Sequence, residues 1–234
     1  MVEVMDRSVI PKSDRILLCW CDNGLTDGKF TEGIVYSILS SGMPITSAMR
    51  VQGNQIGRQR QNAMEHWYDQ TDFDWILWVD SDIVLTNDVL YKVWSTAHPT
   101  ERPVVSGTYF ISKQNEKALM APYPALFNWT DSDYTVSYVH PLPKDAVIKV
   151  GAAGFGFVLM HRNAVKQMRE VHGPTTYFNE TGVGDQFVSE DINFFRLMDK
   201  AGVPLYAHTG ATVQHMKRFS LDVEYYKFFW EKNG

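Results

Sequence analysis

Long apolar runs are missing from this chain. No stretch approaches the ~20 consecutive apolar residues that a membrane-spanning helix requires. The first residues, Met1–Arg7, have neither the basic flank nor the apolar segment of a secretory signal. We therefore expect a soluble, cytoplasmic protein with no transmembrane segment.

Positive charge is also scarce. The 234 residues include 22 Lys and Arg against 27 Asp and Glu, which gives a net charge of -5. Because an acidic surface does not attract a polyanion, nucleic acid is not an expected partner. The length suits one compact unit, so we expect a single domain over residues 1–234.

Cysteine is nearly absent, and only Cys19 and Cys21 are present. One intervening residue places both side chains on the same face of an extended strand. This spacing fits neither a zinc site nor a redox pair. We expect two buried free thiols, which is the usual state of free cysteine.

The first hundred residues alternate between short apolar runs and segments of helical periodicity. The predicted strands are Arg15–Cys21, Ile45–Val51, Trp75–Val79 and Pro103–Ser106, and the predicted helices are Phe30–Ser41, Arg58–Tyr68 and Asn87–Ala97. This alternation predicts an α/β fold with a mixed, mostly parallel sheet flanked by helices. Residues 15–110 then form a Rossmann-like nucleotide-binding half.

The second half, residues 111–234, is less regular. Lys113–Lys149 is rich in Pro, Tyr and Asp, which favours loops and short antiparallel strands. Beyond it the pattern predicts strands Phe157–Met160 and Pro204–Ala207, a glycine-bearing loop at Gly182–Gly184, and helices Asn163–Val171, Asp191–Ala201 and Leu221–Trp230. We expect this half to bind the second substrate and to contribute catalytic groups.

The most informative motif is Asp80-Ser81-Asp82, which follows the apolar run Trp75–Val79. Alternation along an extended chain would turn both carboxylates to the same side and Ser81 away. Ligands of open α/β sheets bind at this carboxyl end of the strands. Two like charges so close repel each other, so the pair suits a hard divalent cation that lies against a phosphate.

This aspartate pair resembles the Asp-x-Asp motif of glycosyltransferases with the GT-A fold. Other segments agree with that family in order and spacing: the helix Gly57–Ala63, the glycine-rich Gly151–Gly156, the acidic Ser189–Asp191 and the late strand Val213–His215. The likeness runs from about Arg15 to Lys217. It is greatest to the small chlorovirus-type and mannan-polymerase-type enzymes.

The resemblance implies a metal-dependent transfer of a hexose from a nucleotide diphosphate sugar, with UDP as the favoured nucleotide, to a glycan or glycoconjugate hydroxyl. Asp80, Asp82 and His215 are the expected ligands of Mn²⁺ or Mg²⁺, since imidazole beside carboxylates suits manganese. Asp80 also faces the donor. Lys217 is expected to contact the diphosphate, whose charge grows as the glycosidic bond breaks.

The acidic motif supplies the expected catalytic base. Asp191 could cap the helix that starts there, or it could take the proton from the acceptor hydroxyl. In inverting GT-A enzymes the acidic motif has the second role, and we expect an inverting reaction with Asp191 as base. Glu190 is expected to contact and support the residues that bind the nucleotide sugar donor.

Further residues are expected around the donor. The resemblance assigns Arg58, Arg60 and Asn62 to donor contacts, although an ordinary solvated helix face is the competing interpretation. Asp22 ends the first strand, where it can meet the base or ribose or else cap a helix. Gly154 is expected to allow close approach of the backbone to the sugar.

Two other features stay open. Aromatic residues of the middle segment could stack on an acceptor sugar or pack in the core: Tyr123, Phe127, Trp129, Tyr134 and Tyr138. The alternative functions are a carbohydrate-binding module with a degenerate site, a sugar-1-phosphate nucleotidylyltransferase and a metal-dependent phosphodiesterase. The second would need an arginine-containing glycine-rich loop after the first strand, and the third would need more His and Asp ligands.

Overall fold

The computed structural model describes residues 14–115, 118–130, 135–183 and 186–217, together with Val223 and Lys227. Most of the predicted helix Leu221–Trp230 lies outside these residues. Tyr134 and Gly184 lie outside them as well.

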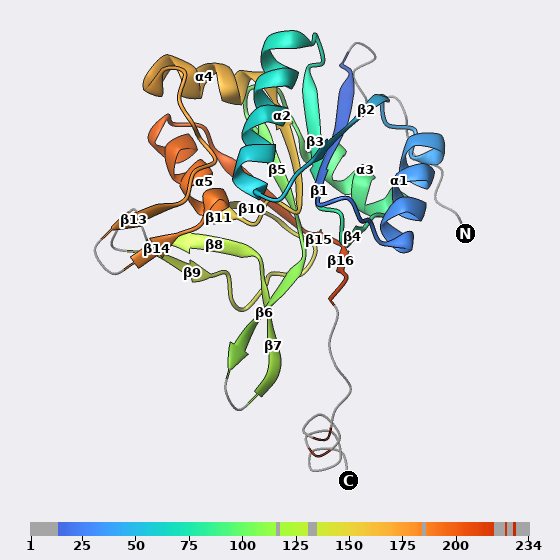
Figure 1. The fold of residues 1–234 in the computed structure, drawn as a ribbon, viewed down its shortest axis with the longest axis vertical. Helices are drawn as coiled ribbons and strands as arrows, with labels where there is room; N and C mark the ends of the chain where they lie inside the picture. Colours follow the sequence, from blue (N-terminus) through green and yellow to red (C-terminus); the bar gives the residue numbers. More distant parts are fainter. Residues whose placement is uncertain are drawn as a thin grey trace.

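A seven-stranded sheet forms the centre of the described chain (Figure 1). In spatial order its strands are β10 (Val147–Val150), β15 (Leu205–Thr212), β5 (Val104–Thr108), β12 (Phe157–His161), β3 (Trp75–Val79), β1 (Ile16–Asp22) and β2 (Ile45–Gln52). β1 is parallel to both β2 and β3, and β15 is parallel to β5. β12 runs antiparallel between β3 and β5, and β10 is antiparallel to β15. The predicted mixed, mostly parallel sheet is confirmed.

Helices cover both faces of this sheet. α1 (Gly28–Ser40) and α3 (Asn87–Thr96) lie on one face, and α2 (Ile56–Gln70), α4 (Arg162–His172) and α5 (Glu190–Lys200) lie on the other (Figure 1). No helix in the described part of the chain combines the length and the apolar character needed to cross a bilayer.

The two faces of β3 show why the predicted apolar run becomes a central strand. All five of its residues are buried. Ile76 and Trp78 enter the core beneath α2, α4 and α5, whereas Trp75, Leu77 and Val79 enter the core beneath α1 and α3. A strand covered on both sides needs apolar residues at every position, and for this reason the run is continuous.

The cysteines of β1 behave as predicted. Cys19 and Cys21 are both buried and free. Burial, together with the neighbouring Cys21, raises the pKa of the Cys19 thiol well above its ordinary value. The pair therefore belongs to the core.

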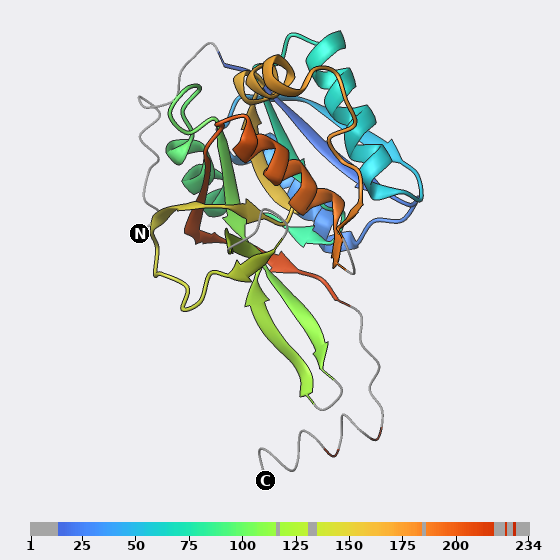
Figure 2. The same cartoon turned by 90° about the vertical axis from the view of Figure 1, so that its left-hand side faces the viewer.

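Short antiparallel pairs complete the second half. They are the hairpin β6 (Phe110–Asn115) with β7 (Ala118–Pro124), the sheet of β8 (Leu126–Trp129), β9 (Val136–Tyr138) and β11 (Ala152–Ala153), the pair β13 (Thr181–Val183) with β14 (Gln186–Val188), and the pair β4 (Ile83–Val84) with β16 (Gln214–His215). The β6–β7 hairpin projects from the body (Figure 2). The predicted short antiparallel strands are confirmed. The predicted loop at Gly182–Gly184 is wrong for Gly182 and Val183, which pair with Phe187 and Gln186.

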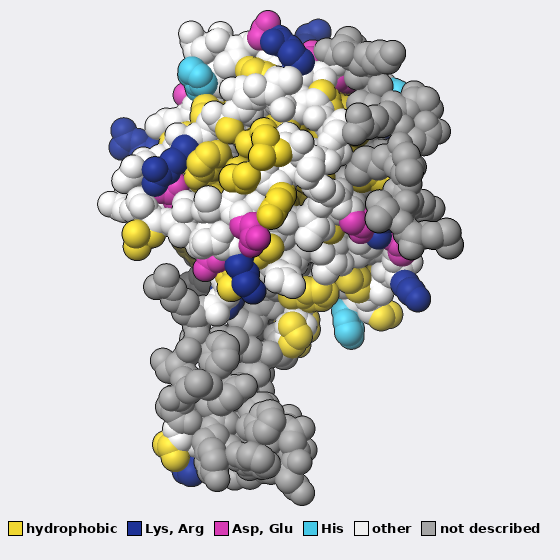
Figure 3. Space-filling view, turned by 90° about the vertical axis from the view of Figure 1, so that its right-hand side faces the viewer, with side chains coloured by type: hydrophobic (Ala, Val, Ile, Leu, Met, Phe, Trp, Pro, Cys, Tyr) yellow, Lys and Arg dark blue, Asp and Glu magenta, His cyan; other side chains and the backbone are white. Residues whose placement is uncertain are grey.

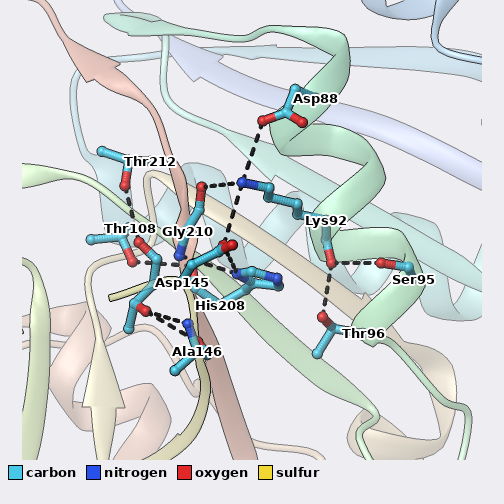
Figure 4. Close-up of polar contacts among 11 residues, drawn as sticks. Asp88, Lys92, Ser95, Thr96, Thr108, Asp145, Ala146, His208, Gly210 and Thr212 are labelled. Carbon is cyan, nitrogen blue, oxygen red and sulfur yellow. Dashed lines mark hydrogen bonds and ion pairs between the residues drawn. The ribbon is translucent and has the colours of Figure 1, made fainter. Parts of the chain in front are cut away.

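β15 is longer than its apolar pattern predicts, since it ends at Thr212 and not at Ala207. Its pairing with β5 shifts register between Ala207 and Thr212. Figure 4 shows how a lysine of α3 reaches this irregular end. The Lys92 ammonium donates to the carbonyl of Gly210 at 3.1 Å and lies 3.4 Å from Asp145. Tertiary contacts therefore stabilise an extension that local sequence does not indicate.

The outer side of α1 is unusually apolar. Figure 3 looks onto the side of the molecule that carries α1, and hydrophobic side chains gather near the middle of this view. Val35, Tyr36 and Leu39 are 47%, 58% and 77% exposed, while Phe30 of the same helix is 2% exposed. α1 thus has one face in the core and a second apolar face with no cover from the described residues.

We expect the two faces of α1 to respond differently to truncation. Phe30→Ala should lower the free energy of unfolding by about 3–5 kcal/mol, because it opens a cavity in the core. Leu39→Ala should change it by less than about 0.5 kcal/mol, because the side chain has few neighbours. Urea unfolding followed by circular dichroism measures both. A comparable loss for Leu39→Ala would contradict the exposed position of this side chain.

Candidate active site

Polar residues from distant parts of the sequence meet at one edge of the sheet. Asp22 ends β1, Asp80 follows β3 and Tyr109 follows β5, so all three lie where parallel strands have their carboxyl ends. β12 begins at the same edge, since Phe157 pairs with Val79. This is the usual ligand-binding edge of an open α/β sheet, and the structure places the predicted Asp80 and Asp82 there.

The Asp80–Asp82 segment is a turn and not an extended strand. The Ile83 amide donates to the Asp80 carbonyl at 3.0 Å, which closes the turn, and the Asp80 amide donates to the Gly156 carbonyl at 3.0 Å. The expectation that strand alternation turns both carboxylates to one side is therefore wrong. The turn directs the two carboxylates to different partners.

Asp82 faces His215 and Lys217. Its Oδ2 lies 3.1 Å from His215 Nε2 and accepts a hydrogen bond from Lys217 Nζ at 2.9 Å. β16 holds His215 in place, because His215 pairs with Ile83 next to the aspartate. Burial alone would raise the pKa of Asp82, but the contacts with His215 and Lys217 outweigh it and hold the pKa below its ordinary value.

The backbone fixes the orientation of the His215 ring. Nδ1 lies 2.9 Å from the Phe110 carbonyl, which can only accept, so Nδ1 must carry the proton. The ring also packs edge-on against Tyr109, with centroids 5.0 Å apart. Nε2 is consequently directed at Asp82. A carbonyl that fixes the tautomer in this way is the usual support of a metal-binding histidine.

Asp80 faces Arg60 of α2. The Nη2 atom of Arg60 lies 2.9 Å from Asp80 Oδ1 and 3.2 Å from Oδ2, and its Nη1 donates to Glu190 at 2.6 Å. The arginine side chain is 5% exposed and its guanidinium lies 5.2 Å from the Phe155 ring centroid. Burial disfavours the charged form, but Asp80 and Glu190 more than offset this and raise the pKa of Arg60.

Glu190 and Asp191 open α5 beside this arginine. Burial raises the pKa of Glu190, although Arg60 opposes the shift. Asp191 accepts from the Ser189 hydroxyl and, at 2.8 Å, from the Ile192 amide. The residue at the N-cap position is Ser189, so Asp191 lies within the first turn, where the helix dipole stabilises a carboxylate.

The glycine-rich segment packs against a tyrosine that the sequence did not single out. A Cβ on Gly154 would lie 1.9 Å from the Tyr109 hydroxyl oxygen, so only glycine fits there. The Gly156 amide donates to the same oxygen at 3.3 Å. Burial and the nearby Asp80 raise the pKa of Tyr109. The close approach at Gly154 is therefore made to Tyr109, a lone tyrosine after β5 that no sequence motif marks.

Asp22 is held by an arginine that sequence reasoning missed. Arg50 of β2 donates to it through Nε at 2.6 Å and through Nη2 at 2.8 Å, and the Gly24 amide adds a bond of 2.7 Å. The hydrogen bonds from Arg50 hold the pKa of Asp22 below its ordinary value. Arg50 and Asp22 form an ion pair between the side chains of two neighbouring strands, so only the fold brings them together.

Arg58 and Asn62 turn away from Arg60. Both are exposed, and they line a pocket of ≈ 470 Å³ with the loop that follows β2, which includes Gly53 and Gln55. The predicted trio of α2 is therefore divided. Arg58 and Asn62 face an open pocket, and Arg60 faces the carboxylates of Asp80 and Glu190.

The predicted metal ligands are likewise divided. Among the described residues, no three His, Cys, Asp or Glu side chains converge as a metal site. Asp82 and His215 lie together, but Asp80 is paired with Arg60. Carboxylate oxygen with imidazole nitrogen is a donor set that suits Mn²⁺, and the Phe110 carbonyl supports the histidine. These two residues fit a divalent cation, and Asp80 would have to change partner to join them.

The pair of Asp22 and Arg50 predicts a pH-dependent stability. Asp22→Asn should lower the free energy of unfolding by about 1–3 kcal/mol near neutral pH. The folded-state pKa of Asp22 is lowered, so the pair is fully stabilising above the unfolded pKa of about 3.9 and is lost as the pH falls through the folded value. Urea unfolding between pH 7 and pH 3 should show the difference from wild type shrinking. A difference that stays constant to the lowest pH would contradict the pairing.

Comparison with known proteins agrees with the fold. No protein-family model matches the chain. It is 31% identical over 114 residues to the "Mannan polymerase complex subunit MNN9" of Candida albicans, an alignment that takes in 47% of this chain and 29% of that protein. The chain therefore matches less than a third of this relative.

Two solved structures share the architecture. A197 from STIV superposes with a TM-score of 0.54 at 15% identity, over 87% of this chain and 86% of that one. GalNAc-T7, crystallised with UDP, GalNAc and Mn²⁺, gives a TM-score of 0.51 at 8% identity, over 92% of this chain and 45% of that one. The fold of the chain is therefore of the GT-A type, and about half of its sequence is similar to part of a mannan polymerase subunit.

Proposed function

We propose that this chain is an enzyme that transfers a hexose from a nucleotide diphosphate sugar, with UDP as nucleotide, to a hydroxyl of a glycan or glycoconjugate. The observation that carries the proposal is Asp82 with His215 and Lys217 at the carboxyl edge of a GT-A sheet. The UDP, GalNAc and Mn²⁺ of the GalNAc-T7 structure support this class of donor and a metal. The mannan polymerase relative supports a glycan acceptor.

The metal site would be formed by Asp82 and His215, with Asp80 as a third ligand. A divalent cation bound there supplies charge stabilisation to a diphosphate leaving group. Lys217 Nζ, 2.9 Å from Asp82 and half exposed, adds a mobile positive charge at the same place. Its ammonium would shift from Asp82 to a phosphate oxygen when the donor binds, which stabilises the negative charge that grows there.

The nucleotide would enter beside α2. Arg58 and Asn62 line an open pocket between α2 and the loop after β2, and a guanidinium and an amide supply the donors that a phosphate or a ribose accepts. Asp22 already receives hydrogen bonds from Arg50 and Gly24. We therefore assign Asp22 the role of holding Arg50 and the end of β1 in place.

Asp191 is the base that we propose for the acceptor hydroxyl. It is half-buried at the start of α5, next to Glu190, which is paired with Arg60. Its Oδ1 accepts from Ser189 and Ile192, which fixes the carboxyl group and leaves the other oxygen for a substrate proton. A base on the acceptor side gives in-line displacement and inversion at the anomeric carbon.

Donor binding should require both the metal and the site. We expect calorimetric titration with UDP to show binding in the presence of Mn²⁺ and none with EDTA, and Asp82→Asn should abolish the metal-dependent binding. GDP is the comparison nucleotide. Glu170→Gln removes an exposed carboxylate of α4 and should bind UDP like wild type.

Other results would contradict the proposed site or favour one of the alternative functions. Binding of nucleotides that is indifferent to Mn²⁺ and to Asp82→Asn would exclude the proposed site. Sugar binding that survives loss of both Asp80 and Asp82 would favour a carbohydrate-binding module. Release of diphosphate from a nucleoside triphosphate and a sugar phosphate would favour a nucleotidylyltransferase.

The base is tested separately from donor binding. Asp191→Asn keeps the shape and the contacts with Ser189 but cannot take a proton. We expect the turnover number to fall by about 10²–10⁴-fold, while the dissociation constant for UDP with Mn²⁺ stays near that of wild type. Turnover that is unchanged, or a product with the same anomeric configuration as the donor, would contradict the role of Asp191.

A further inference from the structure

We infer that Arg60 is a positioning residue that competes with the divalent cation for Asp80. The inference rests on the proposed function only in requiring that a cation binds at this edge. It replaces the expectation from sequence that Arg60 contacts the donor.

Arg60 occupies the core-facing stripe of α2. Together with Ala63, Met64 and Trp67 it follows the i, i+3, i+4, i+7 pattern of an apolar helix face, and these three residues are 0% exposed. The Arg60 side chain is itself 5% exposed and lies over Phe155. The guanidinium therefore reaches Asp80 and Glu190 from the core side of α2, and Arg60 does not line the pocket of Arg58.

The guanidinium is fully committed to two carboxylates. Nη2 contacts both oxygens of Asp80, at 2.9 and 3.2 Å, and Nη1 contacts Glu190 at 2.6 Å. Removing one partner of such a buried pair leaves an uncompensated charge, which is costly. Arg60 thus couples the turn after β3 to the start of α5.

This coupling explains why the predicted metal ligands do not converge. While both Asp80 oxygens face Nη2, Asp80 cannot turn toward Asp82 and His215. A cation that recruits Asp80 must weaken the pair with Arg60, and it must also approach the positive guanidinium. Both effects oppose metal binding. The benefit of Arg60 is that Asp80 and Glu190 are held in fixed positions between turnovers.

Neutralising Arg60 should therefore tighten metal binding and impair turnover together. We expect Arg60→Gln, which keeps polar contacts but loses the charge, to lower the dissociation constant for Mn²⁺ by about tenfold or more, measured by calorimetry on metal-free protein with and without UDP. The turnover number should fall, because Asp80 and Glu190 lose their shared partner. A merely structural role would loosen the site and weaken Mn²⁺ binding.

Matched variants separate charge from stability. Arg169→Gln removes an arginine that is likewise paired with one carboxylate, Asp69, through two nitrogens and stacked over Tyr68, on the other side of α2. It should leave Mn²⁺ affinity unchanged. Arg60→Lys keeps the charge and should stay within about threefold of wild type in Mn²⁺ affinity. It serves as the second test if Arg60→Gln unfolds, and affinity in Arg60→Lys that rises tenfold would contradict a role of charge.

The outcomes distinguish this inference from the proposed function. If the wild type binds no Mn²⁺ with or without UDP, the metal-dependent function fails and the competition fails with it. If the wild type binds Mn²⁺ and folded Arg60→Gln binds it equally or more weakly, only the competition is overturned.

Discussion

Neutralisation of carboxylates gathered at one edge of the sheet is the constraint on which this structure depends. The turn after β3 and the start of α5 bring together Asp80, Asp82, Glu190 and Asp191. Like charges at such distances repel each other and resist burial, so cations from other elements must accompany them. The structure supplies Arg60 from α2 and Lys217 from the segment after β15, and His215 adds a contact with Asp82. Asp80 is paired with Arg60, and Asp82 is paired with Lys217. The pairs Arg60–Glu190 and Asp82–Lys217 connect residues 15–110 with residues 111–234.

The antiparallel strand β12 makes this arrangement possible. It lies between β3 and β5, and Gly156, the residue before it, accepts from the Asp80 amide and donates to the Tyr109 hydroxyl oxygen. Because β12 is antiparallel to both neighbours, its first residues and not its last lie at the carboxyl edge of β3 and β5. The insertion of β12 therefore sets the position of the turn, while β4 and β16 set the position of His215.

The division of α2 has a functional consequence. One face of the helix presents Arg58 and Asn62 to an open pocket, and the opposite face sends Arg60 into the core. In the proposed function, a donor in the pocket and a cation that recruits Asp80 would act on the two opposite faces of this helix.

The sequence by itself determined the alternating elements and the edge of the sheet at which Asp80 and Asp82 lie. β3 was predicted residue for residue, because its five apolar residues lie between Asp74 and Asp80. The position of Asp80 and Asp82 at the edge of the sheet followed from that strand. The roles of Asp22 and Arg60 did not follow. Asp22 pairs with Arg50, 28 positions away, and Arg60 pairs with Glu190, 130 positions away. The sequence shows that Arg60 lies on an apolar stripe, but which carboxylates meet it depends on strand order and helix packing. Ion partners across such separations are chosen by the tertiary structure, since local periodicity carries information only about neighbours within a few turns or strand residues.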